Sequence, residues 1–206
     1  MDEKNKKRLQ IINYIFSKLD SSNGLSKEFI GKLLYMSNKL FLLKYGCTIT
    51  GDKFLAFERG TNCSESLGIM DLDKKYAQDN DAIKEFKKLY DRSKREHSEK
   101  THTIFLKDKF RDDNYDTISD KEKEIIDIIL NRFGKMRDSE ISNYTHNFLE
   151  WKEHEKCLRN QVAKVCNIDM KKVFEDDTFW EDEQLSKYLD KENRKIPQMI
   201  FDGDID

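Results

Sequence analysis

The sequence predicts a mainly α-helical domain with a small antiparallel β element, an α+β fold. Helix breakers are scarce, because the 206 residues include one proline and eight glycines. Hydrophobic residues make up 37% of the chain and recur at helical spacing through most of it, which is enough apolar material for a core. Two short runs rich in β-branched and aromatic residues, at 53–59 and 101–107, supply the β element.

The first part of the chain is expected to form two helices. Residues 7–19 carry one apolar stripe at helical spacing, and the sequence SSNG at 21–24 ends it. The second helix begins after Ser26, whose hydroxyl can cap exposed backbone amides, and runs to Tyr45, where Gly46 can end it. It is apolar around most of its circumference, so we expect it to be the central buried helix.

The β element is expected to consist of two strands that pair with each other. The strand at 53–59 is bracketed by Gly51 and Gly60. The strand at 101–107 should lie beside it, because a lone strand leaves its backbone groups without partners.

A charged insertion near 71–100 separates these two strands. Its segment DAIKEFKKLYDRSKRE keeps apolar residues at helical spacing, which predicts an exposed amphipathic helix followed by a mobile stretch near 91–100. The charge run itself is interpreted as a solvated face.

The second half of the chain is expected to be helical. Ser119 and Glu122 have the spacing of a capping box, and the helix that they start should end at Gly134. A short helix from 138 to 144 and a longer one over 147–166 should follow.

The last part of the chain is acidic. Residues 169–190 predict one or two further helices, and an extended tail is expected after Lys191. The region 175–206 contains eleven acidic residues against four basic ones.

Charge and composition exclude several classes of function. The net charge of -2 argues against a general nucleic-acid binder, which normally carries a strong positive charge. No apolar run is long enough to span a membrane, and the first residues, MDEKNKKRLQ, do not resemble a signal peptide, so a cytoplasmic protein is expected. The four cysteines form no CxxC pair and are expected to be reduced thiols.

The sequence carries no motif of an enzyme or a metal site. A phosphate-binding loop, a GxGxxG turn, a GxSxG nucleophile elbow and an HExxH motif are all missing. The histidine and cysteine spacings do not match a zinc site, so no metal, cofactor or catalytic activity is expected. An enzyme would need a thiol and an imidazole brought together by folding, and Cys63 with His146 is the first such pair to consider.

Three segments are candidates for a contact surface, and each has a structural alternative. The sequence ITGD at 49–52 also suits a plain turn. The polar sequence ISNYTH at 141–146, followed by Trp151, also suits a corner between helices with the tryptophan in the core. The acidic region 175–206 could dock on a basic partner or be a solvated appendage.

A series of short motifs follows one order along the chain. They are LLYMSNKL at 33–40, KYG at 44–46, ITGDKF at 49–54, ISDKE at 118–122, and ISNYTH at 141–146 with Trp151 and Lys152 after it. Their order and spacing resemble those of the Panacea domain, the family of SocA-like antitoxins and phage-associated GepA proteins, over residues 8–155.

One segment departs from the pattern of that family. The family usually follows its first strand with a proline-containing turn and a serine, whereas residues 60–64 here, GTNCS, keep the glycine and the serine without a proline. The turn is therefore expected to be looser.

With this resemblance, residues 1–155 are expected to form the Panacea-like domain with its charged insertion, and 156–206 a helical, acidic C-terminal extension and tail.

The resemblance implies a non-catalytic, phage-associated or bacterial antitoxin that neutralises a protein toxin by direct contact. The partner is then a protein, and neither nucleic acid nor a membrane is expected. Aromatic side chains dominate the hot spots of protein interfaces, so the contact surface is expected at exposed aromatic residues near the strand turn and near His146. The residues assigned to it are Thr50, Asp52, Phe57, Arg59, Asn62, Tyr144, His146 and Trp151.

Two alternatives to an antitoxin remain open besides the enzyme. A phage-encoded inhibitor of a host defence complex, such as an anti-CRISPR protein, would also act by binding a protein. A DNA-binding transcriptional autoregulator would need a basic recognition helix, but the segment 147–165 balances its basic residues with acidic ones. The basic residues are Lys152, Lys156, Arg159 and Lys164, and the acidic ones are Glu150, Glu153 and Glu155.

Overall fold

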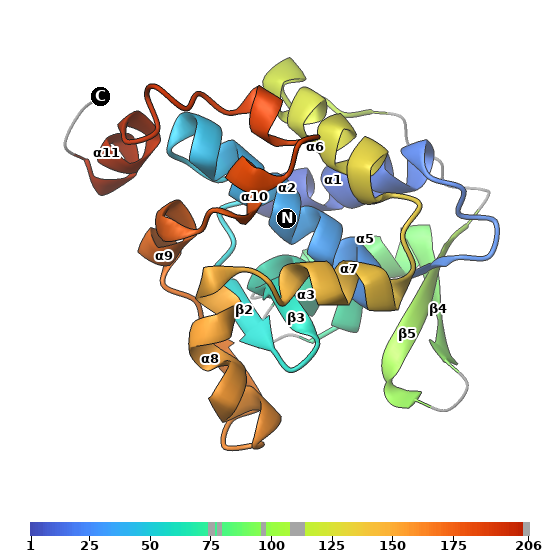
Figure 1. The fold of residues 1–206 in the computed structure, drawn as a ribbon. Coiled ribbons are helices and arrows are strands. Elements are labelled where there is room, and N and C mark those ends of the chain that lie inside the picture. The colour runs from blue at the N-terminus through green and yellow to red at the C-terminus, as the bar shows by residue number, and fades with distance from the viewer. Residues whose placement is uncertain (74–76, 78–79, 96–97, 108–113, 204–206) are drawn as a thin grey trace.

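The structure is a computed structural model that describes residues 1–73, 77, 80–95, 98–107 and 114–203. The described part is mainly α-helical with two small antiparallel sheets, which confirms the predicted fold class (Figure 1). Its helices are α1 (Glu3–Lys18), α2 (Lys27–Tyr45), α3 (Ser64–Asp71), α5 (Asn80–Leu89), α6 (Asp120–Phe133), α7 (Asp138–Thr145), α8 (Leu149–Arg159), α9 (Met170–Glu175), α10 (Thr178–Glu181), the 3-10 helix η2 (Ser186–Tyr188) and α11 (Ile196–Asp202). Its strands are β1 (Leu25–Ser26), β2 (Phe54–Phe57), β3 (Gly60–Cys63), β4 (Tyr90–Arg95), β5 (Ser98–Leu106) and β6 (Val165–Asn167).

Helix α2 is the central helix, as predicted. Helices α6, α7 and α11 and strands β3 and β5 all pack against it (Figure 1). The Ser26 hydroxyl caps its start by accepting a hydrogen bond of 3.0 Å from the Phe29 amide, and Gly46 ends it in the left-handed conformation at φ 72°. Because the helix is apolar on all sides, neighbours can cover its whole circumference.

Strand β2 does not pair with the segment 101–107, so that prediction is wrong. It pairs with β3 on one side and β6 on the other, both antiparallel. Gly60 adopts φ 111°, which side-chain-bearing residues rarely adopt, and lets the chain turn back directly after β2. Residues 60–63 can therefore pair with β2, and closing so short a loop costs little conformational entropy. Strand β5, which holds most of 101–107, pairs with β1 and β4 instead.

The charged insertion forms a helix and a hairpin. Helix α5 is amphipathic as predicted, with Phe86 among its buried residues. The stretch near 91–100, expected to be mobile, contains β4 and part of β5, which form an antiparallel ladder; residues 96–97 lie outside the described part. The buried ring of Tyr90 anchors β4, with ring centroids 4.7 Å from Phe86 and 5.0 Å from Phe16.

The capping box that starts α6 is confirmed. The Ser119 hydroxyl accepts a hydrogen bond of 3.4 Å from the Glu122 amide, and the Glu122 carboxylate accepts one of 2.8 Å from the Ser119 amide. Gly134 follows the last residue of the helix, also as predicted.

Two predictions about the C-terminal part are wrong. The helix expected over 147–166 ends at Arg159, because Gln161 takes a left-handed conformation at φ 55° and the chain reverses into β6. The segment after Lys191 is not an extended tail but ends in α11, which packs on α2. Pro197 lies in the first turn of this helix, where proline is well suited. None of the described helices is both long and apolar enough to cross a membrane.

Candidate functional site

The turn of the β2–β3 hairpin is fixed to the segment that joins α7 and α8. The indole Nε1 of Trp151 donates a hydrogen bond of 2.8 Å to the Phe57 carbonyl oxygen, and His146 Nε2 lies 3.1 Å from the Glu58 carbonyl oxygen. The rings of His146 and Trp151 stack with centroids 4.0 Å apart. Two distant parts of the sequence therefore meet here. Phe57, Arg59 and His146 lie at a surface that we call the hairpin surface, and the buried Trp151 lies beneath it.

The hydrogen bond to Glu58 fixes the chemical state of His146. A carbonyl oxygen only accepts, so Nε2 carries the proton and donates. Burial lowers the pKa of His146, more than its hydrogen bond to the Glu58 carbonyl raises it, so the ring is neutral at pH 7. The Arg159 guanidinium lies 5.7 Å from the Trp151 ring centroid, and Arg59 is exposed. A neutral aromatic stack beside arginines suits contact with a protein.

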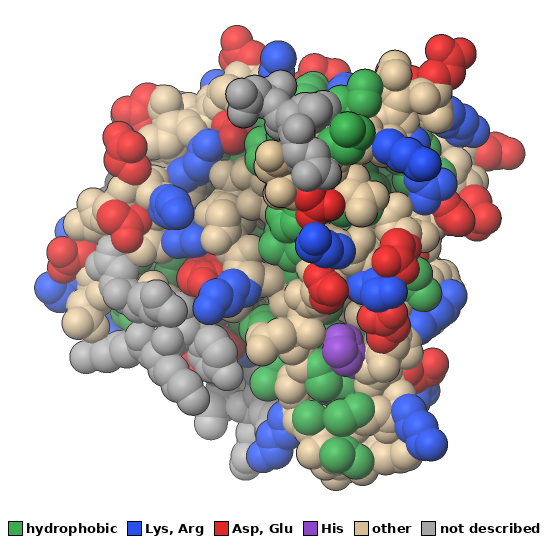
Figure 2. All heavy atoms as spheres, turned by 90° about the vertical axis from the view of Figure 1, so that its left-hand side faces the viewer, with side chains coloured by type: hydrophobic (Ala, Val, Ile, Leu, Met, Phe, Trp, Pro, Cys, Tyr) green, Lys and Arg blue, Asp and Glu red, His purple; other side chains and the backbone are tan. Residues whose placement is uncertain are grey.

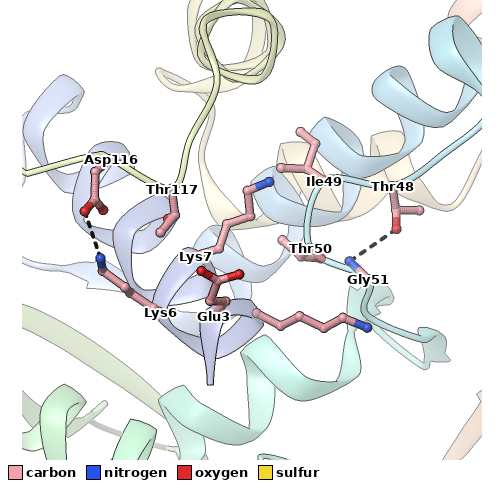
Figure 3. Close-up of a pocket in the computed structure, with 10 residues that line it drawn as sticks. Glu3, Lys6, Lys7, Thr48, Ile49, Thr50, Gly51, Asp116 and Thr117 are labelled. Carbon is pink, nitrogen blue, oxygen red and sulfur yellow. Dashed lines mark hydrogen bonds and ion pairs between the residues drawn. The ribbon is translucent and has the colours of Figure 1, made fainter. Parts of the chain in front are cut away.

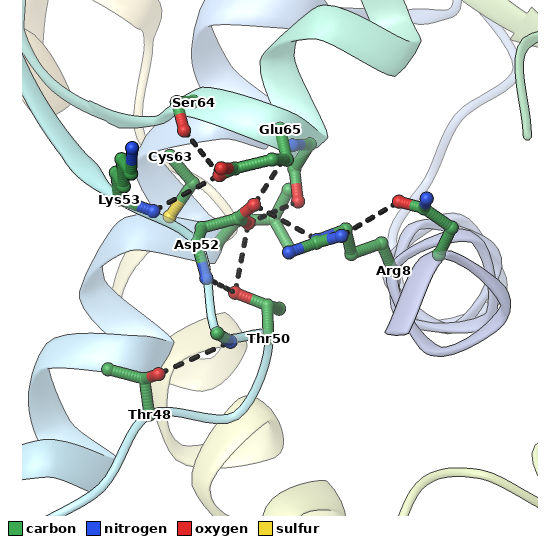
Figure 4. A network of polar contacts seen from close by, with 12 residues as sticks. Arg8, Thr48, Thr50, Asp52, Lys53, Cys63, Ser64 and Glu65 are labelled. Atoms are coloured by element: carbon green, nitrogen blue, oxygen red, sulfur yellow. Dashed lines mark hydrogen bonds and ion pairs between the residues drawn. The ribbon is translucent and has the colours of Figure 1, made fainter. Parts of the chain in front are cut away.

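Thr50 and Asp52 belong to a different, buried network (Figure 4). The Asp52 carboxylate accepts hydrogen bonds from Thr50 Oγ1 at 2.9 Å and Ser66 Oγ at 2.6 Å. The Asn38 side-chain oxygen accepts one of 3.0 Å from the Thr50 amide. Arg8 Nε lies 3.0 Å from Asp52 Oδ1, but its N–H is not aimed at the oxygen, so this contact is an ion pair rather than a hydrogen bond. The network fixes the 49–52 loop to α1, α2 and α3.

Asp52 and Glu65 have pKa values that move in opposite directions. Burial raises the pKa of Asp52 to about 7, with Arg8 opposing the shift and the side-chain hydrogen bond to Glu65 adding to it. Burial also acts to raise the pKa of Glu65, but hydrogen bonds from Asp52 and Ser64 outweigh it and the pKa is lowered. Below about pH 7 the proton of the pair is held on Asp52, and above it Asp52 is the anion that pairs with Arg8. In either state the carboxyl group is buried in its own network, which makes it a structural group.

A cavity of about 500 Å³ lies beside the same loop (Figure 3). Both signs of charge line it, and Lys6 and Asp116 form an ion pair of 2.8 Å at its rim. The lining residues are Glu3, Lys4, Lys6, Lys7, Thr48, Ile49, Thr50, Gly51, Asp116 and Thr117. Neither a thiol nor an imidazole is among these residues.

Asn62 and Tyr144 make structural contacts next to the hairpin surface. Asn62 is buried against α2, where its amide packs so closely on Gly31 that a Cβ there would collide with it. The Tyr144 hydroxyl donates a hydrogen bond of 2.9 Å to Asp182, which also pairs with Arg132 at 3.2 Å. Burial raises the pKa of Tyr144. Both residues thus hold elements together, and of the eight assigned residues only Phe57, Arg59, Tyr144 and His146 have more than a small exposed fraction.

The sequence analysis missed a buried ionic cluster around Lys39. The lysine is fully buried in α2, with Nζ 2.5 Å from Glu150 Oε1, 2.9 Å from Asp176 Oδ2 and 3.8 Å from the Phe148 ring centroid. The Tyr35 hydroxyl donates a hydrogen bond of 2.6 Å to the same Glu150 oxygen. The available signal was a lysine inside an apolar helix. Through Glu150 this cluster joins the start of α8 to α2, and through Asp176 it joins the C-terminal extension to α2.

The acidic C-terminal region is partly neutralised within the molecule. Asp177 pairs with Arg194 at 2.6 Å, in addition to the contacts of Asp176 and Asp182. The face around α8, α9 and α11 has acidic and basic side chains interspersed rather than separated (Figure 2). That face therefore presents no uniform charge to a partner.

The pair of Cys63 and His146 does not form a nucleophile and its base. Cys63 is fully buried, and burial raises the pKa of its thiol well above the usual value. Asn38 Nδ2 lies 3.7 Å from the Cys63 sulfur, while His146 contacts Glu58 and Trp151. Across the described ranges, no three His, Cys, Asp or Glu side chains are grouped so that they could hold a metal ion.

Comparison with known proteins gives one match. The family model described as "Antitoxin SocA-like, Panacea domain" matches residues 30–152, more than half of the chain. The match includes most of α2, the 49–52 loop, the hairpin and Trp151. No curated protein and no solved structure matches the chain.

Proposed function

The chain belongs to the SocA-like antitoxin family of Panacea domains, and from this we propose that it neutralises a protein toxin by direct contact, without catalysis. The observation that carries the proposal is the family match, which spans both halves of the hairpin surface. The toxin would be a protein made in the same cell, and the complex would form in the cytoplasm.

The hairpin surface is suited to this role because it is rigid before binding. Two contacts to backbone carbonyls and one ring stack hold the turn in place, so little entropy is lost when a partner binds. Phe57, Arg59 and His146 would contact the toxin, and buried Trp151 would position them. Thr50, Asp52 and Asn62 would act indirectly, by holding the loop and β3 in place, and Tyr144 would act at the edge of the surface.

We propose a role without catalysis because three potentially reactive side chains are buried or already hydrogen-bonded. The Cys63 thiol is enclosed, the His146 ring is neutral and hydrogen-bonded to backbone, and the Asp52 carboxyl is buried in its own network. Each of these groups already has a structural partner, which leaves binding as the activity that the exposed residues best support.

The test has two steps. Affinity purification of the tagged chain from its native host, followed by mass spectrometry, identifies the bound protein. That protein is then expressed alone in bacteria, where it should arrest growth, and co-expression of the chain should restore growth. A double variant, Arg59→Ala with His146→Ala, should lose the rescue, whereas Arg137→Ala, at an exposed arginine on another turn, should keep it.

Two results would overturn the proposal. Recovery of a host defence complex that is not toxic would instead favour the phage-encoded inhibitor. A toxic partner whose growth arrest persists when the chain is co-expressed would exclude neutralisation by contact.

A further inference from the structure

Lys32, on α2, is a buried cation without a fixed partner. The residue is 2% exposed, yet its side chain makes no ion pair or hydrogen bond with another residue that the structure describes. Lys39, two turns further along the same helix, contacts two carboxylates. A buried charge normally has a partner, because removing it from water is costly. Lys32 therefore lacks the anion that its burial calls for.

The Lys32 side chain runs beneath the hairpin surface. A Cβ at Gly60 would lie 3.1 Å from Lys32 Cε, so the lysine passes directly under the turn. The residue keeps 2% of its surface exposed, and exposed Arg59 in the same turn acts on it with like charge, so Lys32 lies close beneath the molecular surface. The ammonium group is therefore within reach of a group brought to the turn from outside.

The charged groups that act on Lys32 lie on α2, on α7 and in the hairpin turn. Glu28 on α2 and Asp138 on α7 act on it with opposite charge, and Arg59 in the turn acts with like charge. His146, at the end of α7, is also within electrostatic reach. Burial is the dominant influence and lowers the pKa of Lys32 to about 8, so the two carboxylates do not compensate for the lost water.

Glu28 does not serve as the missing partner. It lies one turn before Lys32, but no ion pair joins the two side chains. Its Oε2 atom is itself buried without a hydrogen-bond partner, and burial raises the pKa of its carboxyl group. An acid and a base therefore lie near each other at this site without pairing.

We propose that Lys32 is an anchor for the carboxylate of an aspartate or glutamate side chain that the protein partner brings to the hairpin turn. This inference rests on the proposed function and adds to it the chemistry of the partner. A singly charged carboxylate fits better than a phosphate, because Glu28 and Asp138 would repel a second negative charge. Exposed Arg59, beside the opening, would steer an acidic segment toward Lys32.

The anchor gives the complex a defined pH dependence. A carboxylate beside Lys32 favours its charged form and raises its pKa above about 8. Above about pH 8, binding of the carboxylate is then coupled to uptake of a proton by Lys32. The affinity should be highest above the ordinary pKa of the partner carboxylate, about 4. It should decrease above about pH 8, as free Lys32 loses its proton.

The first test needs no variant of uncertain stability and no toxin. The wild-type chain is labelled with ¹³C at lysine Cε, and the Lys32 signal is followed through a pH titration in sodium propionate and in sodium chloride at equal ionic strength. Propionate stands for the acidic side chain. We expect it to raise the Lys32 pKa by about one unit relative to chloride, the effect of an opposite charge at contact distance. Lys84, whose side chain is 72% exposed, is the control and should not respond.

Other results of this titration overturn the anchor. Equal Lys32 curves in propionate and chloride would mean that no carboxylate binds there. A larger effect of inorganic phosphate would assign the site to another anion, and an equal effect on Lys84 would make the response nonspecific.

The second test separates the anchor from the proposed function. With the captured toxin, Lys32→Met should weaken binding about tenfold and remove the decrease in affinity above pH 8, whereas Lys84→Met should change neither. Circular dichroism checks that both variants fold. If the chain rescues growth but Lys32→Met binds with unchanged affinity and pH profile, the anchor fails and the antitoxin proposal stands. If no toxin is neutralised, the propionate titration still decides whether the site binds a carboxylate.

Discussion

The indole Nε1 of Trp151 donates a hydrogen bond of 2.8 Å to the carbonyl oxygen of Phe57, 94 residues earlier in the chain. This bond joins the end of β2 to the start of α8, so the position of the hairpin turn depends on a residue in the second half of the domain. A change at Trp151 is therefore expected to affect both the stability of the fold and the proposed hairpin surface.

Trp151→Phe should destabilise the protein by about 1–3 kcal/mol, because it keeps most of the ring but leaves the Phe57 carbonyl without its donor. Urea denaturation measures the free energy of unfolding. Trp180→Phe is the matched control, since the Trp180 Nε1 is buried without a partner and its removal should cost little or improve stability. Equal losses in the two variants would show that ring packing, and not the hydrogen bond, fixes the turn.

Gly60→Ala should destabilise the hairpin, because alanine is strained at φ 111° and its Cβ would collide with Thr145 Oγ1. We expect a loss of about 1–3 kcal/mol in thermal or urea unfolding. Gly203→Ala provides the comparison, since Gly203 also has a positive φ but nothing lies within 4 Å of its added Cβ. A loss at Gly60 no greater than at Gly203 would contradict a close approach of the turn to α7.

Lys39→Met should be strongly destabilising, by about 3–5 kcal/mol, because it leaves the buried Glu150 and Asp176 carboxylates without their cation. The triple variant Lys39→Met, Glu150→Gln and Asp176→Asn should recover much of that loss, since no buried charge then remains unpaired. Urea denaturation of both proteins gives the comparison. If the triple variant is no more stable than Lys39→Met, loss of packing rather than unpaired charge causes the effect.

Asp52→Asn should change how stability depends on pH. The pKa of Asp52 is raised from 3.8 to about 7 in the folded protein, so the folded state binds its proton more tightly than the unfolded state. The stability from this group is fully present below pH 3.8 and is lost as pH rises to 7. The wild type should therefore lose stability relative to Asp52→Asn over that range, measured by urea denaturation.

Asp116→Asn is the control for the pH experiment. Lys6 donates a hydrogen bond to Asp116 and lowers its pKa, so this exposed carboxyl group titrates below the range in question. Its stability difference from the wild type should remain constant between pH 4 and pH 7. A constant difference for Asp52→Asn as well would contradict the raised pKa.

Arg59→Ala should weaken toxin binding by about 1–2 kcal/mol without changing stability, because Arg59 is exposed in the hairpin turn and arginines are common hot spots. Isothermal titration calorimetry with the captured toxin measures the affinity. Arg137→Ala, at a side chain that is 81% exposed, is the control and should bind like the wild type. Unchanged binding of the Arg59 variant would place the interface elsewhere.

Local patterns in the sequence were sufficient for the helices that carry their own start and stop signals. Ser26 and Gly46 define α2, and Ser119 with Glu122 defines the start of α6, because capping depends on residues a few positions apart. The mainly α fold class and the family resemblance followed from the same kind of local evidence.

Strand pairing and the C-terminal boundaries could not be read in this way. The pairing of β2 with β6 joins Ala56 to Cys166, and no local signal connects them. From its sequence alone, the segment 160–167 is expected to continue the preceding helix. In the folded chain it can instead pair with the edge of β2. Edge hydrogen bonds and burial, which exist only in the folded chain, outweigh the weak helical preference of such a short segment.

The same distinction between local and tertiary information applies to the candidate site. The sequence by itself determined which segments are unusual, the 53–59 strand with its turn and the segment around His146, because residue types and spacing are local properties. Only the tertiary structure decided that Trp151 and His146 meet the hairpin turn, that Asp52 and Asn62 are buried, and that Lys32 lies under the turn without a partner. Burial and contact depend on the packing of distant segments, and they determine which charged side chains keep water or a counter-ion.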